Sequence, residues 1–234
     1  MVINIDRHIY LSYENVKKNE ALAPVHTFEY DGRTFIGLNT VFSPAVFRDA
    51  FFFSENMPTK TGERFLEIGC GSGLIAVNAA LTGFREVVAT DINAAAIRNT
   101  KINALLHQVD HRLTAFVSDV FDGIDRDACG RFDVIFWNTP FINDGQKAVS
   151  DLEKSVFSDY EHGLTKYVSM AKSFLTKGGR VFIGFSSTCG DIDLLDDICR
   201  KNNASVVLKA QYPIFEIVLE LYEITYHSSN INKK

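Results

Sequence analysis

A glycine-rich run between an apolar strand pattern and a helix pattern constrains this chain more than any other feature. It reads FLEIGCGSGL over residues 65–74, with glycines at Gly69, Gly71 and Gly73. Backbone amides with no side chain in the way can close on a ligand there, beside the positive end of the following helix. The run therefore predicts a ligand-binding turn between a strand and a helix of an α/β fold.

The spacing of the glycines differs from a dinucleotide-binding fingerprint. That fingerprint has glycine at the first, third and sixth positions, the last one for close packing of helix on strand. Here the sixth position is Leu74, and the additional glycine, Gly73, stands at the fifth. The acid Glu67 directly before the loop is a second departure. A ligand other than a dinucleotide is therefore expected.

Two further acids stand at the ends of the next two strand patterns. Asp91 closes the second pattern, where it is placed to accept both hydroxyl groups of a ribose. Asp119 follows the third pattern and suits the exocyclic amine of an adenine ring. We include their neighbours Ile92 and Val120 in the predicted cofactor site. Acids in register with the glycine run indicate an adenosine group.

A fourth, buried strand pattern reads FDVIFW over residues 132–137 and ends in Asn138, Thr139, Pro140 and Phe141. Ligands of open α/β sheets bind in the crevice at the carboxyl ends of the strands. The substrate half of the site is therefore expected at this loop.

Acid, glycine loop, acid and acid, each at a strand's carboxyl end, resemble the class I S-adenosylmethionine-dependent methyltransferases over roughly residues 60 to 225. The loop at residues 138–141 is similar to the Asn-Pro-Pro-Tyr/Phe signature of members that act on planar nitrogens. The resemblance implies S-adenosylmethionine as cofactor and S-adenosylhomocysteine as product. The implied cofactor-binding residues are Glu67, Gly69, Cys70, Gly71, Gly73, Asp91, Ile92, Asp119, Val120 and Asn138.

The signature also implies catalytic roles for Asn138, Thr139, Pro140 and Phe141. The Asn138 carbonyl and the backbone carbonyl of residue 139 can each accept one N–H, which turns the nitrogen lone pair toward the methyl group. Phe141 can stack on the flat acceptor. In-line displacement of this kind depends on positioning rather than on a strong base. Thr139 stands where the family usually has proline, so the acceptor's identity is less defined than the reaction type.

The alternation of strand and helix patterns predicts one doubly wound, Rossmann-like α/β domain. Strands are expected at about 64–68, 86–90, 113–117, 132–136, 180–185, 205–210 and 214–223, and helices at about 73–82, 93–106, 162–175 and 191–202. A turn is expected at residues 177–180. The last two strands are separated only by residues 211–213, which predicts an antiparallel hairpin and resembles the reversed seventh strand of the family.

Residues 1–60 are predicted to form an extension of helix, hairpin and aromatic segment over the cofactor mouth, before a methyltransferase domain at 61–226 and a flexible tail at 227–234. The Asp31-Gly32 pair is typical of a tight hairpin, and Phe47 to Phe53 form the aromatic segment. The long segment 142–161 is interpreted either as a lid or specificity element or as a simple helix start.

Composition limits the remaining function classes. The net charge of −5 argues against a broad nucleic-acid surface. No apolar run approaches the roughly 20 residues that span a bilayer, and the amino terminus lacks a signal-peptide core. The four cysteines show no paired C-x-x-C spacing, so a reducing cytoplasm and no metal site are expected.

Several function hypotheses remain open from the sequence. The first is methylation of a protein glutamine side chain, as in the glutamine-N5 methyltransferases of peptide-release factors. Two other acceptors are an rRNA or tRNA base and a small-molecule or natural-product amine. A methyltransferase fold retained as a binding subunit is the non-enzyme alternative. A partner subunit or a homodimer is also left open.

Overall fold

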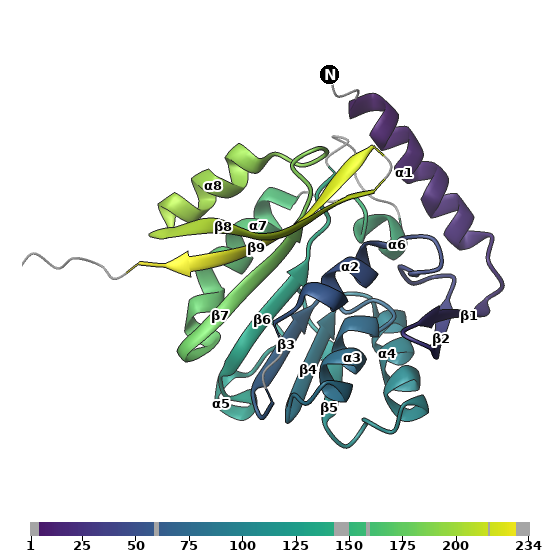
Figure 1. Ribbon diagram of the computed structural model, residues 1–234, viewed down its shortest axis with the longest axis horizontal. Coiled ribbons are helices and arrows are strands. Elements are labelled where there is room, and N and C mark those ends of the chain that lie inside the picture. Colours follow the sequence, from purple (N-terminus) through teal and green to yellow (C-terminus); the bar gives the residue numbers. More distant parts are fainter. Residues whose placement is uncertain (1–4, 59–60, 143–149, 158–159, 215, 228–234) are drawn as a thin grey trace, which may run out of the picture.

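The computed structural model describes residues 5–58, 61–142, 150–157, 160–214 and 216–227. A seven-stranded sheet in the order β5-β4-β3-β6-β7-β9-β8 forms its centre, with a separate two-stranded hairpin beside it (Figure 1). The strands of the sheet are β3 (Arg64–Ile68), β4 (Glu86–Asp91), β5 (Leu113–Val117), β6 (Phe132–Asn138), β7 (Leu175–Phe185), β8 (Ala204–Ile214) and β9 (Ile217–Tyr226). The first five are parallel, and β9 runs antiparallel to both of its neighbours, which confirms the predicted reversed strand.

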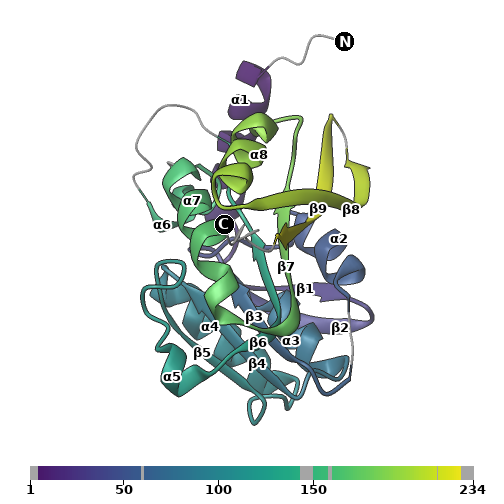
Figure 2. The same ribbon diagram turned by 90° about the vertical axis from the view of Figure 1, so that its left-hand side faces the viewer.

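Helices cover both faces of this sheet (Figures 1 and 2). One face carries α2 (Asp49–Asn56), α3 (Leu74–Leu81) and α4 (Ala94–Leu106), and the other carries α7 (Tyr160–Ala171) and α8 (Ile192–Lys201). Successive strand residues alternate between the two cores: Phe65 and Phe136 pack on the first face, Leu66 and Ile135 on the second. All four are fully buried, as parallel strands covered on both sides should be. The doubly wound α/β prediction is confirmed.

The entry into β7 differs from the sequence expectation. The sequence predicts a turn at residues 177–180 before a strand that starts at 180. In the structure Phe132 pairs with Leu175 and Val134 with Arg180, so residues 176–179 bulge out of a strand that already begins at Leu175. Gly178 has φ +82° within this bulge, a value that glycine adopts without strain.

The β8–β9 hairpin turns later than predicted. Residues 211–213 do not connect the strands but continue β8, and Ile214 pairs with Ile217 next to the turn. Pro213 fits within the strand because β8 is an edge strand whose one neighbour is β9. The hairpin is therefore longer than the sequence suggests, and its tip reaches the functional cavity.

The predicted amino-terminal hairpin is confirmed as β1 (Val25–Tyr30) and β2 (Arg33–Leu38), with positive φ at Asp31 and Gly32. It docks on α4 through the fully buried amides of Asn99 and Asn103, which hydrogen bond to the backbone of β2. In one of these bonds the backbone N–H of Ile36 donates to Asn103 Oδ1 over 2.8 Å. The hydrogen-bonding groups on the free edge of β2 are thereby satisfied.

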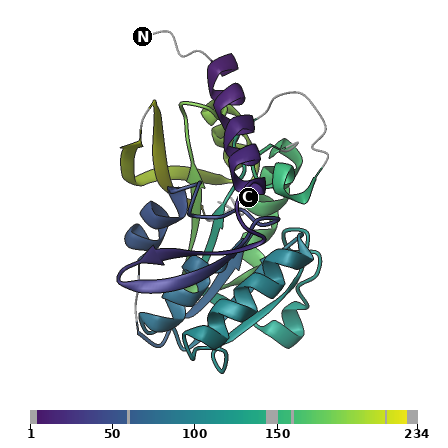
Figure 3. The ribbon, with the colours of Figure 1, turned by 90° about the vertical axis from the view of Figure 1, so that its right-hand side faces the viewer.

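Helix α1 (Ile5–Glu20) precedes the hairpin and lies between the β8–β9 tip and the chain around α6 (Asp151–Lys154) (Figure 3). Its carboxyl end is fixed by the fully buried Asn19. The Asn19 Nδ2 donates to the backbone oxygens of Asn39 (2.9 Å) and Val41 (3.0 Å), and its Oδ1 accepts from the backbone N–H of Ser43 (3.1 Å). The amide thus joins α1 to the segment that leads into α2.

Part of the predicted lid and tail lies outside the described residues, namely 143–149, 158–159 and 228–234. Within the described part of the 142–161 segment, α6 begins with a capping box between Ser150 and Glu153. Among the described ranges, no helix has the length and apolar character that crossing a membrane requires. The same residues contain no group of three or more His, Cys, Asp or Glu side chains that could hold a metal ion.

Candidate functional site

A cavity of about 1170 Å³ opens at the carboxyl ends of β3, β4, β5 and β6. These ends share one edge of the sheet because Ile68 pairs with Thr90 of β4 and with Trp137 of β6. Residues of α1, α6 and the β8–β9 tip line the cavity as well. Small-molecule sites typically occupy about 300–1,000 Å³. The cavity therefore has room for a cofactor and an acceptor group together.

The glycine loop forms one wall of this cavity. Gly69 (φ +68°) and Gly71 (φ +52°) both line it and both have left-handed backbone conformations. A Cβ atom on Gly69 would lie 3.0 Å from Nε1 of Trp137, so glycine is needed for the loop to lie against that ring. Since the loop leads directly into α3, the N-terminus of that helix can face a bound ligand.

Asp91 lines the cavity at the end of β4, next to the exposed Ile92. Its Oδ2 accepts a hydrogen bond from the backbone N–H of Gly71 (2.9 Å), and its Oδ1 accepts one from Asn93 (2.8 Å). Each carboxylate oxygen keeps a free lone pair. Burial raises the pKa of the Asp91 carboxyl to about 6, and the negative charge of Asp151 adds to the shift. The carboxyl is therefore fixed in place and can still accept hydroxyl groups.

Asp119 and Val120 line the cavity after β5. Asp119 Oδ2 lies 3.2 Å from Nζ of Lys166 on α7, and the same Nζ also donates to Asp122. Val120 has φ +50°, which is unusual for a β-branched residue and turns the backbone sharply at this point. The structure therefore brings the predicted adenine-side residues to the same cavity as Asp91.

Three residues that the sequence predicts to bind the cofactor, Glu67, Cys70 and Gly73, lie behind the glycine loop and do not line the cavity. Glu67 is 2% exposed, and burial raises the pKa of its carboxyl well above the usual range. The Cys70 Sγ accepts a hydrogen bond from Thr100 Oγ1 over 3.2 Å. A Cβ atom on Gly73 would lie 2.8 Å from Cα of Thr100. Gly73 therefore allows α3 and α4 to approach each other closely.

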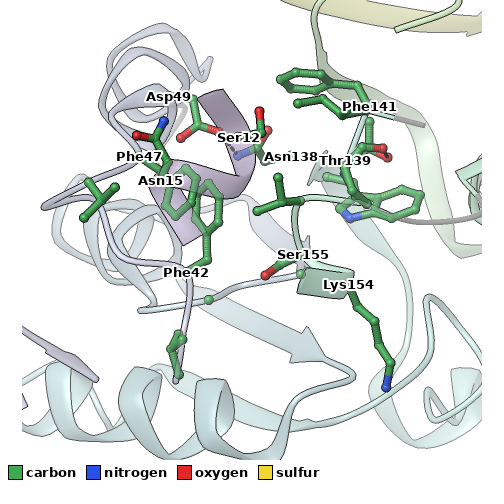
Figure 4. A pocket seen from close by; sticks show the side chains of 18 of the residues that line it. Ser12, Asn15, Phe42, Phe47, Asp49, Asn138, Thr139, Phe141, Lys154 and Ser155 are labelled. Atoms are coloured by element: carbon green, nitrogen blue, oxygen red, sulfur yellow. Dashed lines mark hydrogen bonds between the residues drawn. The ribbon is translucent and has the colours of Figure 1, made fainter. Parts of the chain in front are cut away.

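Asn138 and Asp49 meet in the same cavity and point toward each other (Figure 4). The Asn138 Nδ2 donates to Asp49 Oδ2 over 2.8 Å. The other side-chain oxygens, Asn138 Oδ1 and Asp49 Oδ1, are shielded from water and have no hydrogen-bond partner among the described residues. Burial raises the pKa of the Asp49 carboxyl, although the hydrogen bond from Asn138 opposes the shift. The pair therefore offers oxygen acceptors for N–H groups.

The rest of the predicted catalytic loop lies beside this pair. Thr139, Pro140 and Phe141 all line the cavity, and Thr139 is 2% exposed. The backbone N–H of Thr139 donates to Gly184 of β7 over 3.3 Å, and its hydroxyl donates to the backbone oxygen of Pro140 over 3.2 Å. This hydrogen bond restrains the turn, which a proline at position 139 would restrain through its ring. Phe141 packs edge-on against Phe185, with ring centroids 6.0 Å apart.

Sequence reasoning missed two contributors to the site. Asp49 follows the aromatic residue Phe47 and is the one acid within residues 47–53. It and its neighbour Arg48 are the two charged residues in this largely aromatic stretch, which is a signal that could have marked it. The second contributor is one face of α1, with His8, Ser12 and Asn15 among the cavity residues. Their spacing of four and three positions is helical, but the sequence alone does not reveal what that face meets.

Residues 32–216 match the family model described as "Methyltransferase small domain". A Methanocaldococcus jannaschii protein described as "Putative protein N5-glutamine methyltransferase" is 30% identical over 162 residues, which cover 68% of this chain and 78% of that protein. A "Release factor glutamine methyltransferase" of Aquifex aeolicus is 39% identical over 77 residues, which cover 32% of this chain and 26% of that protein. This second match spans about a quarter of the relative's length.

Among solved structures, Methanocaldococcus jannaschii Trm5 in complex with adenosine is similar with a TM-score of 0.61. The sequence identity is 15%, and the match covers 88% of this chain and 56% of that one. At this identity the similarity concerns the fold. The family match, by contrast, runs from the amino-terminal hairpin to the end of β8 and includes every strand-end residue of the cavity described above. The chain therefore belongs to the methyltransferase small domain family and is an S-adenosylmethionine-dependent methyltransferase.

Proposed function

We propose that this enzyme methylates a planar amide or amine nitrogen, with a protein glutamine side chain as the first candidate acceptor. The observation that carries the proposal is the orientation of the Asn138 amide. Because Asp49 accepts one N–H of Nδ2 at 2.8 Å, the direction of the amide is set, and its carbonyl oxygen Oδ1 is the acceptor that has no partner among the described residues. A group that offers N–H hydrogen atoms complements this oxygen, whereas an ether or carbonyl oxygen would not.

The cofactor half of the site fits S-adenosylmethionine. When bound, this cofactor supplies an electrophilic methyl group on a sulfonium sulfur. Asp91 would accept the ribose hydroxyls, Ile92 and Val120 would flank the adenine ring, and Asp119 would accept from its amine. The left-handed backbone at Gly69 and Gly71 leaves the space a ligand needs, since side chains there would narrow the cavity.

The acceptor half would work mainly by positioning. The Asn138 Oδ1 and the backbone carbonyl of Thr139 would each accept one N–H of the acceptor and so turn its lone pair away from the carbonyl or ring that delocalises it. Phe141 would stack on the flat group. Holding a weak nucleophile in a near-attack geometry can supply a large share of the rate acceleration.

Glutamine is favoured among acceptors by two similarities. A relative that matches 68% of this chain is described as a "Putative protein N5-glutamine methyltransferase". The shorter match is to a release factor glutamine methyltransferase. A primary amide also has the two N–H groups that Asn138 and the backbone carbonyl of Thr139 can accept.

A methyl-transfer screen tests the proposal. The enzyme is incubated with methyl-labelled S-adenosylmethionine and, separately, with glutamine-containing peptides and proteins, bulk RNA and a metabolite pool. Label is expected on glutamine nitrogen, and Asn138→Ala should lower its rate of incorporation about 10²-fold while Arg200→Ala, on an exposed part of α8, should not change it. Label confined to RNA or to metabolites would refute the glutamine assignment. Absence of S-adenosylmethionine binding in calorimetry would refute the cofactor assignment.

A further inference from the structure

Helix α1 presents three different faces, and one of them is polar and faces the cavity. His8, Ser12 and Asn15, spaced as i, i+4 and i+7, line the cavity together with Asn138 and Asp49 (Figure 4). The next face, formed by Ile9, Tyr13 and Val16, packs against the apolar cluster that includes Phe157. The third face turns to solvent, with Tyr10 62% exposed.

The apolar face fixes α1 in place. Tyr13 stacks on Phe157 with ring centroids 4.3 Å apart, and Val16 is 3% exposed. The carboxyl end is held by Asn19, and at the amino end Arg7 forms an ion pair of 2.7 Å with Glu216 at the β8–β9 tip. The polar face is therefore held over the cavity by contacts on other sides of the helix.

The polar face has unused hydrogen-bonding capacity. His8 is 7% exposed, and its imidazole has no hydrogen-bond partner among the described residues. Ser12 is half-buried and has no side-chain partner in the same part of the chain. Asn15 accepts from Lys18 Nζ over 3.5 Å through Oδ1, which leaves its N–H₂ group free. A ligand in the cavity could therefore hydrogen bond to these side chains without displacing a contact within the protein.

We propose that His8, Ser12 and Asn15 determine acceptor specificity by hydrogen bonding to the peptide groups that flank the methylated glutamine. This inference rests on the proposed function. Hydroxyl, carboxamide and neutral imidazole can each donate and accept, and none carries a fixed charge. They complement the alternating N–H and C=O groups of a peptide backbone. The phosphates of a nucleic acid bind lysine and arginine, and the two cations that α1 brings to the cavity already have partners, since Arg7 pairs with Glu216 and Lys18 donates to Asn15 Oδ1.

The length of the polar face agrees with a short peptide segment. His8 and Asn15 are seven positions apart, which corresponds to about 10 Å along a helix at about 1.5 Å per residue. About three residues of extended chain span the same distance. Helix α1 also lies outside residues 32–216, the part of the chain that matches the family model. This wall of the cavity is therefore formed by residues outside the matched domain. The acceptor-specific contacts are therefore separate from the methyl-transfer residues.

The experiment compares two acceptors of the same chemistry, a glutamine-centred pentapeptide and free glutamine. The variant Ser12→Ala/Asn15→Ala should raise the KM for the pentapeptide about tenfold with kcat within about twofold, because two hydrogen bonds to the peptide are lost. The kcat/KM for free glutamine should not change. His8→Ala should act in the same direction, and His8→Gln, which keeps a donor and an acceptor, should recover part of the loss.

Tyr10→Ala on the solvent face is the matched control and should leave both acceptors unaffected. Trp137 is the one tryptophan of the chain and lines the cavity, so its fluorescence measures S-adenosylmethionine binding, which should be unchanged in all variants. An unchanged KM for the pentapeptide, or an equal loss for both acceptors, would overturn the inference. Failure of the wild type to methylate either acceptor would instead refute the proposed function. In that case the Kd for the pentapeptide is measured by Trp137 fluorescence. A higher Kd for Ser12→Ala/Asn15→Ala than for the wild type would support the role of the polar face in peptide binding, and an equal Kd would overturn it.

Discussion

Asn138 at the end of β6 donates its Nδ2 to Oδ2 of Asp49, the first residue of α2, over 2.8 Å and across 89 positions of sequence. The bond fixes the direction of the Asn138 amide. It is made in a water-excluded setting, since the second oxygen of each side chain is shielded as well. A hydrogen bond in such surroundings is stronger than one at the surface.

The first prediction concerns this pair. Asn138→Ala should lower kcat about 10²-fold, since it removes an acceptor that positions the nucleophile, and Asp49→Ala should lower kcat about tenfold by freeing the amide. The Kd for S-adenosylmethionine should stay within about twofold. Steady-state kinetics and Trp137 fluorescence measure both quantities. In the double variant the two effects should not add, because one residue acts through the other. Additive losses would show that Asp49 acts independently.

The second prediction concerns pH. The pKa of Asp91 is raised to about 6, so its carboxyl is ionised above that pH and protonated below it. Since the ionised form accepts ribose hydroxyls, affinity for S-adenosylmethionine should fall as pH decreases through about 6. Calorimetry between pH 5 and 8 would measure the dependence. Asp91→Asn should weaken binding by on the order of 1.5–3 kcal/mol at pH 8 and flatten the profile. A wild-type profile that is flat across this range would contradict the assignment.

The third prediction separates the glycines of the loop. Gly73→Ala should destabilise the fold by about 2–4 kcal/mol, because φ is +82° and the new Cβ would meet the backbone of α4 at Thr100. Gly62→Ala is the matched control. Gly62 has φ +87° with no atom within 4 Å of the added Cβ, so it should lose only about 1–2 kcal/mol. Urea unfolding measures both, and equal losses would exclude the steric account.

The fourth prediction concerns the anchor of α1. Asn19→Ala removes three hydrogen bonds and leaves the backbone groups of the buried Val41 and Ser43 without partners. A loss of about 2–3 kcal/mol in the free energy of unfolding is expected. Lys17→Ala, an exposed change two positions earlier, should cost less than about 0.5 kcal/mol. If Asn19→Ala were as stable as Lys17→Ala, the amide would not hold the helix.

Sequence patterns anticipated that Gly69, Asp91 and Asp119 would meet at one cavity, because these residues are local in the chain. Each one directly follows a strand, and parallel strands bring their carboxyl ends to one edge of the sheet. Three other predicted residues, Glu67, Cys70 and Gly73, do not line the cavity but lie behind the loop. A glycine that leaves space for a ligand cannot be told in the sequence from a glycine that lets a neighbouring helix pack closely, because both are required for the same lack of a side chain.

The amino-acid sequence by itself determined the doubly wound sheet, the reversed β9 and the chemistry of the strand ends, because these depend on periodicity and on residues next to each strand. Only the tertiary structure decided that Asp49 orients Asn138 and that the polar face of α1 lines the cavity. Both relationships join segments far apart in the chain. They arise where α2 packs on the sheet and where α1 packs on the chain around α6, and no local pattern encodes which polar side chains such packing brings together.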